Sequence, residues 1–259
     1  MKIGFVGLGK MGGRMVERLM KGGHAIVAYD PIEAALKEAE MKGAIPVSSF
    51  EELVERLETP RAVWIMVPSG TPTEETIASL SSLMETGDLI IDGGNSFYKD
   101  SMQRAQELGK RGIAFLDAGT SGGVWGLKIG YCLMVGGEKE AFKQVEPVFK
   151  TLAPEEGYAR VGPSGAGHFV KMIHNGIEYA LLQGYAEGFE IMNAKEELKL
   201  DLAKISHLWN QGSVVRSWLL ELAENAFKKN PRLESIKGHV QDSGEGRWAV
   251  AEAIEKDVP

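Results

Sequence analysis

One stretch of the chain carries five polar side chains at spacings that a helix would bring onto a single face. They stand at positions i, i+3, i+4, i+7 and i+8: Lys171, His174, Asn175, Glu178 and Tyr179. Apolar residues occupy much of the remaining circumference, which predicts a mostly buried helix over residues 164–194 with a polar stripe lining a cleft. Histidine and asparagine beside lysine and glutamate indicate a functional site. The alternative is a solvated face with a satisfied histidine.

A glycine-rich turn near the start of the chain indicates dinucleotide binding. It fits the pattern G-x-G-x-x-G, with the residues Gly7, Leu8, Gly9, Lys10, Met11 and Gly12. Glycine allows a tight turn, close approach of a pyrophosphate and close helix–strand packing, and the N–H groups of the following helix favour phosphates. Asp30 ends the second predicted strand, where a carboxylate can bind the adenosine ribose hydroxyls. The alternative is a glycine-rich turn that holds no ligand.

Two further segments come directly after predicted strands. Asp92–Ser96 follows one strand and Ala118–Gly123 follows the next. Ligands of doubly wound sheets bind at the carboxyl ends of the strands, and a run of small residues offers backbone N–H groups to a carboxylate or phosphate. Each segment could also be a simple tight turn.

Short apolar runs alternate with amphipathic stretches over the first two thirds of the chain. The predicted strands are Ile3–Val6, Ala25–Tyr29, Ala62–Val67, Leu89–Ile91, Ile113–Leu116, Tyr131–Val135 and Gly157–Val161. The predicted helices lie near residues 11–22, 32–42, 49–57, 73–84, 98–111 and 139–152, and then near 164–194, 201–210, 214–227 and 248–256. This pattern predicts an α/β fold: a Rossmann-type, doubly wound parallel sheet over residues 1–163, followed by an all-α domain over residues 164–259.

Composition limits the class of protein further. The 259 residues include 29 Lys and Arg against 36 Asp and Glu, so the net charge is 29 − 36 = −7, which argues against nucleic-acid and anionic-membrane surfaces. A single cysteine, Cys132, excludes an internal disulfide and gives an oxidising compartment no support. No apolar run is long enough to span a bilayer, and Met1 leads straight into a predicted strand. We therefore expect a cytoplasmic protein.

Several of these motifs together resemble the decarboxylating 6-phosphogluconate dehydrogenases, of the shorter, NAD-using kind. The resemblance rests on the segments Gly7–Gly12, Asp92–Ser96, Ser121–Gly123, Gly165–Tyr179, Gly212–Ser217 and Gly244–Trp248. It spans essentially the whole chain, and Gly165–Tyr179 is its most specific part. The resemblance implies conversion of 6-phosphogluconate to ribulose 5-phosphate and CO₂ with reduction of a nicotinamide dinucleotide. It also implies a homodimer or homotetramer.

The resemblance implies a role for each candidate residue. Lys171 would accept the C3 hydroxyl proton and then hydrogen-bond the ketone, and Glu178 would protonate C1 of the enediol. No metal is expected, because the new ketone accepts the electrons released on decarboxylation. The implied substrate contacts are Asn95, Ser121, Gly122, Gly123, His174, Asn175 and Tyr179, the last of these to the phosphate. The implied cofactor contacts beyond the glycine turn and Asp30 are Val67, Pro68, Ser69 and Asn95.

The residues after Asp30 favour NAD over NADP. Residues 31–36 contain no cation, and Glu33 adds a second negative charge where an NADP 2′-phosphate would lie. The NADP-using members of the resembled family carry an Asn-Arg-Thr-like triplet where this chain has Asp30-Pro31-Ile32. We therefore expect a preference for NAD.

The chain departs from the resembled pattern at its C-terminal end. Asp242–Glu245 lacks the lysine found before the Gly-x-Gly-Lys/Arg-Trp segment in full-length members, although Arg247 is present. The family continues with helices that carry a phosphate-binding arginine, so we expect the helical domain to be incomplete and substrate binding to be weak. Two alternatives stay open: another β-hydroxyacid dehydrogenase, or a catalytically silent NAD-binding module.

Overall fold

The computed structural model of the chain describes residues 1–240 and 242–258. Within it the chain forms two compact units, Met1–Met172 and Ile173–Pro259. Each unit is described by itself below. The domain boundary that the sequence predicts, residue 163, lies between the last strand and the first long helix after it, and it stays a prediction.

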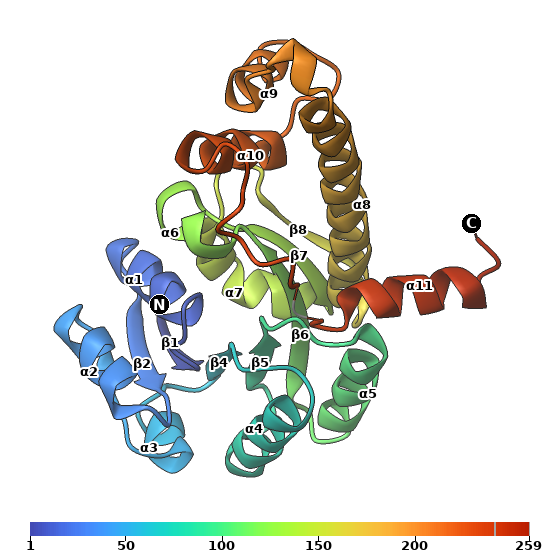
Figure 1. Cartoon of the computed structure of the whole chain (residues 1–259). Helices are drawn as coiled ribbons and strands as arrows, with labels where there is room; N and C mark the ends of the chain where they lie inside the picture. Colours follow the sequence, from blue (N-terminus) through green and yellow to red (C-terminus); the bar gives the residue numbers. More distant parts are fainter. Residues whose placement is uncertain (241, 259) are drawn as a thin grey trace. The chain divides into compact units, whose positions relative to one another are not determined.

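The first unit is an eight-stranded sheet with helices on both faces (Figure 1). Its strands are β1 (Lys2–Val6), β2 (Ala25–Tyr29), β3 (Ile45–Pro46), β4 (Ala62–Ile65), β5 (Leu89–Asp92), β6 (Ala114–Ser121), β7 (Cys132–Gly137) and β8 (Tyr158–Gly162). The spatial order is β3-β2-β1-β4-β5-β6-β7-β8. Its helices are α1 (Gly12–Lys21), α2 (Glu33–Met41), α3 (Phe50–Glu55), α4 (Thr71–Leu83), α5 (Tyr98–Gly109), α6 (Gly126–Ile129) and α7 (Lys139–Leu152). The predicted Rossmann-type fold is confirmed.

Alternate residues of the central strands enter two separate apolar layers. Phe5 and Trp64 pack with residues of α1, α2 and α7 on one face. Val6 and Val63 pack with residues of α3, α4 and α5 on the other. Because both faces are covered, the strands read as continuous apolar runs, which is why the sequence revealed them.

The seventh strand runs against the direction that the sequence analysis assigned to the sheet. β7 pairs antiparallel with β6, whereas the other pairs in the sheet are parallel. Only a short helical segment, Gly123–Ile129, separates the two strands. A parallel return needs a crossover of a dozen or more residues, so the short connection reverses the chain.

The same pairing overturns the prediction for Ala118–Gly123. The segment does not follow a strand as a whole: Ala118 to Ser121 lie within β6, opposite Val135 to Cys132 of β7. Only Gly122 and Gly123 come after the strand. Small residues such as Ala118 and Gly119 have low strand propensity, so the sequence did not predict a strand here. The hydrogen-bonded pairing with β7 keeps the segment extended.

Side-chain caps explain where some of the helices begin. Ser49 caps α3 by accepting a hydrogen bond from the backbone N–H of Glu52, and Ser217 caps α10 through Leu220. The Ser217 cap makes α10 begin at Trp218, later than the predicted start near residue 214. The two-residue strand β3 was not predicted, because two residues carry no periodicity.

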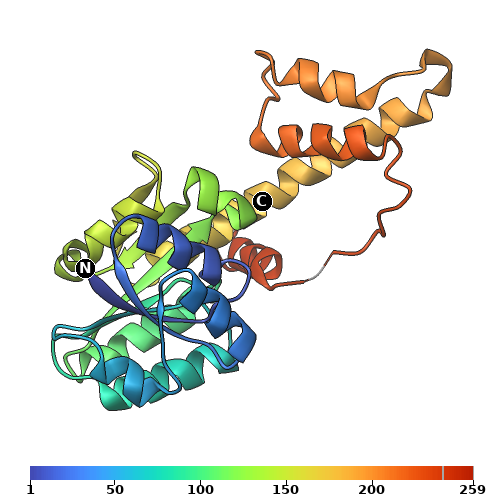
Figure 2. The ribbon, with the colours of Figure 1, turned by 90° about the vertical axis from the view of Figure 1, so that its left-hand side faces the viewer.

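The second unit is helical. It contains most of α8 (Ala166–Ala194), then α9 (Leu202–Trp209), α10 (Trp218–Lys229) and α11 (Glu245–Glu255), with a short 3₁₀ turn at Glu196–Leu198. Figure 2 shows α9 and α10 side by side along the C-terminal part of α8. An apolar cluster joins these three helices: Phe189, Leu202, Leu220 and Phe227.

The middle of α8 is less buried than predicted. Ile177 is 58% exposed and Leu181 45% exposed, so the expectation of a mostly buried helix is wrong for this part of the described chain. The cause is the short reach of α9 and α10, whose apolar contacts with α8 begin at Tyr185. Among the helices of the described residues, none is long and apolar enough to cross a membrane.

Candidate active site

The glycine turn lies at the carboxyl end of β1 and leads into α1. Gly7 has φ +93°, and a Cβ built on it would lie 2.4 Å from the carbonyl oxygen of Met66. A Cβ on Gly12 would lie 2.0 Å from the carbonyl oxygen of Gly7, so the protein's own backbone demands both glycines. A Cβ on Gly9 would meet nothing within 4 Å. The space above Gly9 is open, which fits the close approach of a dinucleotide pyrophosphate.

Asp30 follows β2 and is tied to the glycine turn. Its carboxylate accepts hydrogen bonds from the backbone N–H groups of Leu8, at 2.6 Å, and Ile32, at 2.8 Å. Each oxygen receives one of these bonds and keeps a second lone pair for a ribose hydroxyl. The buried carboxylate therefore has a structural role, holding the turn, that the sequence analysis did not anticipate.

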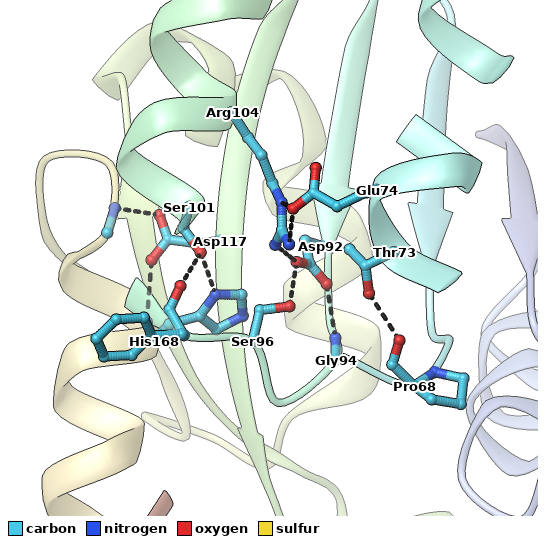
Figure 3. Close-up of polar contacts among 12 residues, drawn as sticks. Pro68, Thr73, Glu74, Asp92, Gly94, Ser96, Ser101, Arg104, Asp117 and His168 are labelled. Carbon is cyan, nitrogen blue, oxygen red and sulfur yellow. Dashed lines mark hydrogen bonds and ion pairs between the residues drawn. The ribbon is translucent and has the colours of Figure 1, made fainter. Parts of the chain in front are cut away.

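Two more predicted cofactor segments lie at the same edge of the sheet. Val67–Ser69 follows β4, and Asn95 follows β5. Asn95 is exposed, but Gly94 and Ser96 on either side of it are buried and bind the Asp92 carboxylate, the first through its N–H and the second through its hydroxyl (Figure 3). The turn therefore presents the Asn95 side chain outward from a fixed base.

The turn that ends β6 contains two consecutive glycines in the left-handed region. Gly122 has φ +129° and Gly123 φ +50°, conformations that other residues rarely adopt. Ser121 is partly buried at the end of the strand. Arg14 of α1 donates to the carbonyl oxygen of Val124 at 2.7 Å, which ties this turn to the helix of the glycine loop.

Lys171 lies on the first turns of α8, where the helix packs directly on β6. The side chain is 7% exposed, and a Cβ built on Gly119 would lie only 2.5 Å from the Lys171 Cβ. A Cβ on Gly167 would lie 2.2 Å from the carbonyl oxygen of Asp117. Glycines at these two positions therefore allow the close contact that sets the place of the lysine.

Asp117 of β6 binds the N-terminal end of α8. Its carboxylate accepts hydrogen bonds from the backbone N–H groups of Gly165, at 2.7 Å, and His168, at 2.9 Å (Figure 3). Burial raises the pKa of this carboxyl, and the nearby His168 and the N–H donors partly offset the effect. The Nδ1 atom of His168 lies 2.7 Å from the Ser101 hydroxyl of α5. These contacts anchor the start of the helix that carries Lys171.

The four other residues of the predicted polar stripe, His174, Asn175, Glu178 and Tyr179, lie in the second unit. The Nδ1 atom of His174 is 3.1 Å from Oδ1 of Asn175 and 3.8 Å from Oε2 of Glu178. Asn175 is buried and donates through Nδ2 to Oε1 of Glu245, on the first turn of α11, at 2.9 Å. The glycine next to Glu245, Gly246, lies against Tyr179.

The four residues are thus neighbours, and Lys171 precedes them on the same helix within the first unit. Arg247 pairs with Asp242 at 2.7 Å and is exposed.

The sequence analysis assigned no role to Asp117, Arg104 or Glu245. Asp117 is nevertheless visible as a pattern, because a lone carboxylate within an apolar run, as in Phe115–Ala118, must find partners when buried. Glu245 lies between two glycines and stands in no such run. Arg104 gave no such signal, since arginines are common on amphipathic helices.

Comparison with known proteins places both parts of the chain in one group. Residues 2–162 match the family described as the NAD binding domain of 6-phosphogluconate dehydrogenase, and residues 167–259 match its C-terminal domain. The Bacillus subtilis protein YqeC, provisionally named a 6-phosphogluconate dehydrogenase, is 44% identical over 98% of this chain and 85% of its own length. The NAD(+)-dependent, decarboxylating 6-phosphogluconate dehydrogenase of Haloferax volcanii is 42% identical over 100% of this chain and 86% of its own.

A solved structure agrees with these relatives. The 6-phosphogluconate dehydrogenase of Plasmodium falciparum superposes with a TM-score of 0.90 at 30% identity, over 100% of this chain. This chain spans 59% of the length of that protein.

Proposed function

Because the chain belongs to the 6-phosphogluconate dehydrogenase family, we propose that it oxidises 6-phosphogluconate to ribulose 5-phosphate and CO₂ with reduction of NAD. The observation that carries the proposal is the position of Lys171. This buried lysine is held against Gly119 at the edge of the sheet where the glycine turn and Asn95 also lie.

The proposed chemistry needs one base and one acid from the chain. Lys171 accepts the proton of the C3 hydroxyl and then donates a hydrogen bond to the new ketone oxygen. Bound NAD supplies the acceptor for the hydride that leaves C3. The C1 carboxylate is then β to a ketone, so C1 leaves as CO₂, and its bonding electrons form an enediol as Lys171 returns its proton to the ketone oxygen. Glu178 then protonates the former C2 of the substrate, which is C1 of the enediol, while Lys171 takes back the enol proton. The ketone makes a metal unnecessary.

The remaining candidate residues orient the two ligands. Ser121, Gly122 and Gly123 bind the substrate carboxylate together with His174 and Asn175. Tyr179 contacts the phosphate, and Asn95 contacts both substrate and cofactor. The dinucleotide contacts are those predicted above: the glycine turn Gly7–Gly12, Asp30 and Val67–Ser69. The open space above Gly9 and the free lone pairs of Asp30 support this assignment.

A preference for NAD over NADP belongs to the same proposal. The carboxylate of Asp30 is buried and accepts two backbone hydrogen bonds, and residues 31–36 offer no cation, so a 2′-phosphate placed there would face a like charge. We also propose a cytoplasmic homodimer or homotetramer, which the exposed apolar side chains of α8 support.

The test is a coupled assay of the full chain with 6-phosphogluconate. NADH formation and CO₂ release are measured together, with 3-hydroxyisobutyrate as the comparison substrate. We expect both products at equal rates with 6-phosphogluconate. NADH without CO₂, or preference for 3-hydroxyisobutyrate, would indicate another β-hydroxyacid dehydrogenase, for which Glu178 has no role. NAD binding without turnover would indicate a silent module.

A further inference from the structure

A buried carboxylate lies directly behind the exposed Asn95. The Asp92 side chain, at the carboxyl end of β5, is 1% exposed. It accepts hydrogen bonds from the Gly94 N–H at 3.1 Å, the Ser96 hydroxyl at 2.6 Å and the guanidinium of Arg104 at 3.0 Å (Figure 3). The residues before and after Asn95 are thus both hydrogen-bonded to the Asp92 carboxylate, and Arg104 is the cation that pairs with that carboxylate.

Arg104 reaches two carboxylates from its place on α5. Its side chain is 4% exposed. Nη1 donates to Asp92, while Nε and Nη2 donate to Oε1 of Glu74 at 2.9 and 2.5 Å. A planar guanidinium can serve both acceptors at once, which the compact ammonium of lysine cannot do.

The second carboxylate belongs to the element that follows Val67–Ser69. Glu74 lies on the first turn of α4, and the fully buried Thr73 beside it donates its hydroxyl to the carbonyl oxygen of Pro68 at 2.9 Å. A Cβ built on Gly94 would lie 3.0 Å from the carbonyl oxygen of Val67. The two loops are therefore in backbone contact, and Arg104 bridges the elements that carry them.

We propose that Arg104 is a positioning residue that holds the Val67–Ser69 and Gly93–Asn95 loops in one fixed geometry. The proposal rests on the proposed function in that these loops contact NAD and substrate. Arg104 itself touches neither ligand. A shift of about 1 Å in a group that orients reactants can lower a rate about 10²-fold, so loosening this bridge is expected to act on catalysis through Asn95.

The same strand offers a matched control at its other end. Asp88, just before β5, is also 1% exposed and accepts from the backbone N–H of Arg61 at 2.6 Å and from its guanidinium at 3.0 Å. Arg61 and Asp88 lie at the amino edge of the sheet, away from the predicted site residues. Arg61 and Asp88 thus form the same kind of buried ion pair as Arg104 and Asp92, but at the opposite end of β5 from the predicted site.

The experiment compares Arg104→Lys with Arg61→Lys in the full chain. Thermal unfolding, NAD affinity by calorimetry, and kcat and KM for 6-phosphogluconate are measured for both. We expect similar losses of thermal stability. Arg104→Lys should lower kcat/KM by about 10- to 100-fold and weaken NAD binding, whereas Arg61→Lys should stay within about twofold of the unmutated protein. Equal activities of the two variants would overturn the proposal.

A double-mutant cycle separates positioning from general destabilisation. If Arg104 acts through Asn95, the effect of Arg104→Lys should shrink when Asn95 is already alanine. A fully multiplicative loss in the double variant would contradict the proposal. Should Arg104→Lys fail to fold, Arg104→Met with Asp92→Asn removes both charges, and Arg61→Met with Asp88→Asn is its control.

Two readouts do not depend on turnover. Hydrogen exchange of the amides of residues 93–96 and NAD affinity report on the loops whatever the substrate. If the unmutated chain binds NAD but does not oxidise 6-phosphogluconate, the proposed function fails. Faster exchange and weaker NAD binding in Arg104→Lys alone would still support the bridge. Unchanged exchange and NAD affinity would overturn it even in an active enzyme.

Discussion

Replacing Lys171 by methionine keeps much of the side-chain volume and removes the proposed base. We expect kcat to fall by about 10²- to 10⁴-fold or more, because proton transfer from the C3 hydroxyl then has no acceptor. NAD binding, measured by calorimetry, should change little. Lys150→Met, at an exposed lysine of α7, is the control and should remain active. Turnover near that of the unmutated protein in Lys171→Met would exclude the lysine as the base.

Glu178→Gln addresses the second proton transfer. The amide cannot protonate C1, so release of ribulose 5-phosphate should slow more than formation of the ketone. Rapid-quench measurements on a single turnover would show an early rise of NADH followed by slow appearance of the final product. If both steps keep their rates, another group protonates the enediol.

We expect cofactor choice to depend on Asp30 and its neighbour Pro31. The ratio of kcat/KM for NAD to that for NADP should be about 10² or more, from repulsion and lost hydrogen bonds. Asp30→Asn with Pro31→Arg should narrow or reverse it. Because Asp30 also accepts from Leu8 and Ile32, we expect the double variant to unfold at a lower temperature. Asp30→Asn alone separates the two effects, and equal use of both cofactors by the unmutated chain would contradict this role of Asp30.

Among the elements, α8 depends on a residue outside itself. Asp117→Ala leaves the N–H groups of Gly165 and His168 without their acceptor, and a buried unsatisfied donor costs about 1–3 kcal/mol. Urea unfolding should show this loss, and kcat should fall as well because the start of α8 positions Lys171. Ser49→Ala removes a cap from α3 and serves as the control, with lower stability and unchanged kcat. Unchanged kcat in Asp117→Ala would limit Asp117 to a structural role.

How far the sequence predicted each element depends on the kind of contact that forms it. Buried parallel strands such as β1 and β4 are short, continuous runs of apolar residues, so the local sequence was enough to predict them. The direction of β7 and the extension of β6 to Ser121 come from the pairing between these two strands, which no local pattern records. Among the site residues, the role of Gly7 was predictable from its motif. The hydrogen bond from Leu8 to Asp30 and the bridge made by Arg104 were not, because they join residues distant in the chain.

At the scale of the whole molecule, one buried histidine makes stability depend on pH. His24 is 8% exposed, and burial, helped by the N-terminal ammonium, lowers its pKa below the usual 6.5. Below pH 6.5 the unfolded chain binds a proton at this group before the folded chain does, so this contribution to stability is present above 6.5 and is lost as pH falls towards the lowered pKa. His24 alone can change the free energy of unfolding by at most about 1.4 kcal/mol per pH unit, because it binds one proton.

Denaturant unfolding between pH 7 and pH 5 measures this effect. His24→Gln should flatten the pH dependence of the free energy of unfolding in that range, since no proton is then taken up at this position. His239→Gln, at an exposed histidine, is the control and should keep the original slope. A slope that persists unchanged in His24→Gln would assign it to other groups.

The order of strands in the sheet has a consequence for synthesis on the ribosome. β2 and β3 extend the sheet on one side of β1, and β4 to β8 then add on the other side in the order in which they leave the ribosome. Every strand after β1 therefore meets a partner that has already emerged, whereas the second edge of β1 stays open until β4 has been made. Nascent chains fold from the N-terminus at about 5–20 residues per second of elongation. All the strands of the sheet on which the start of α8 packs are thus translated before Lys171.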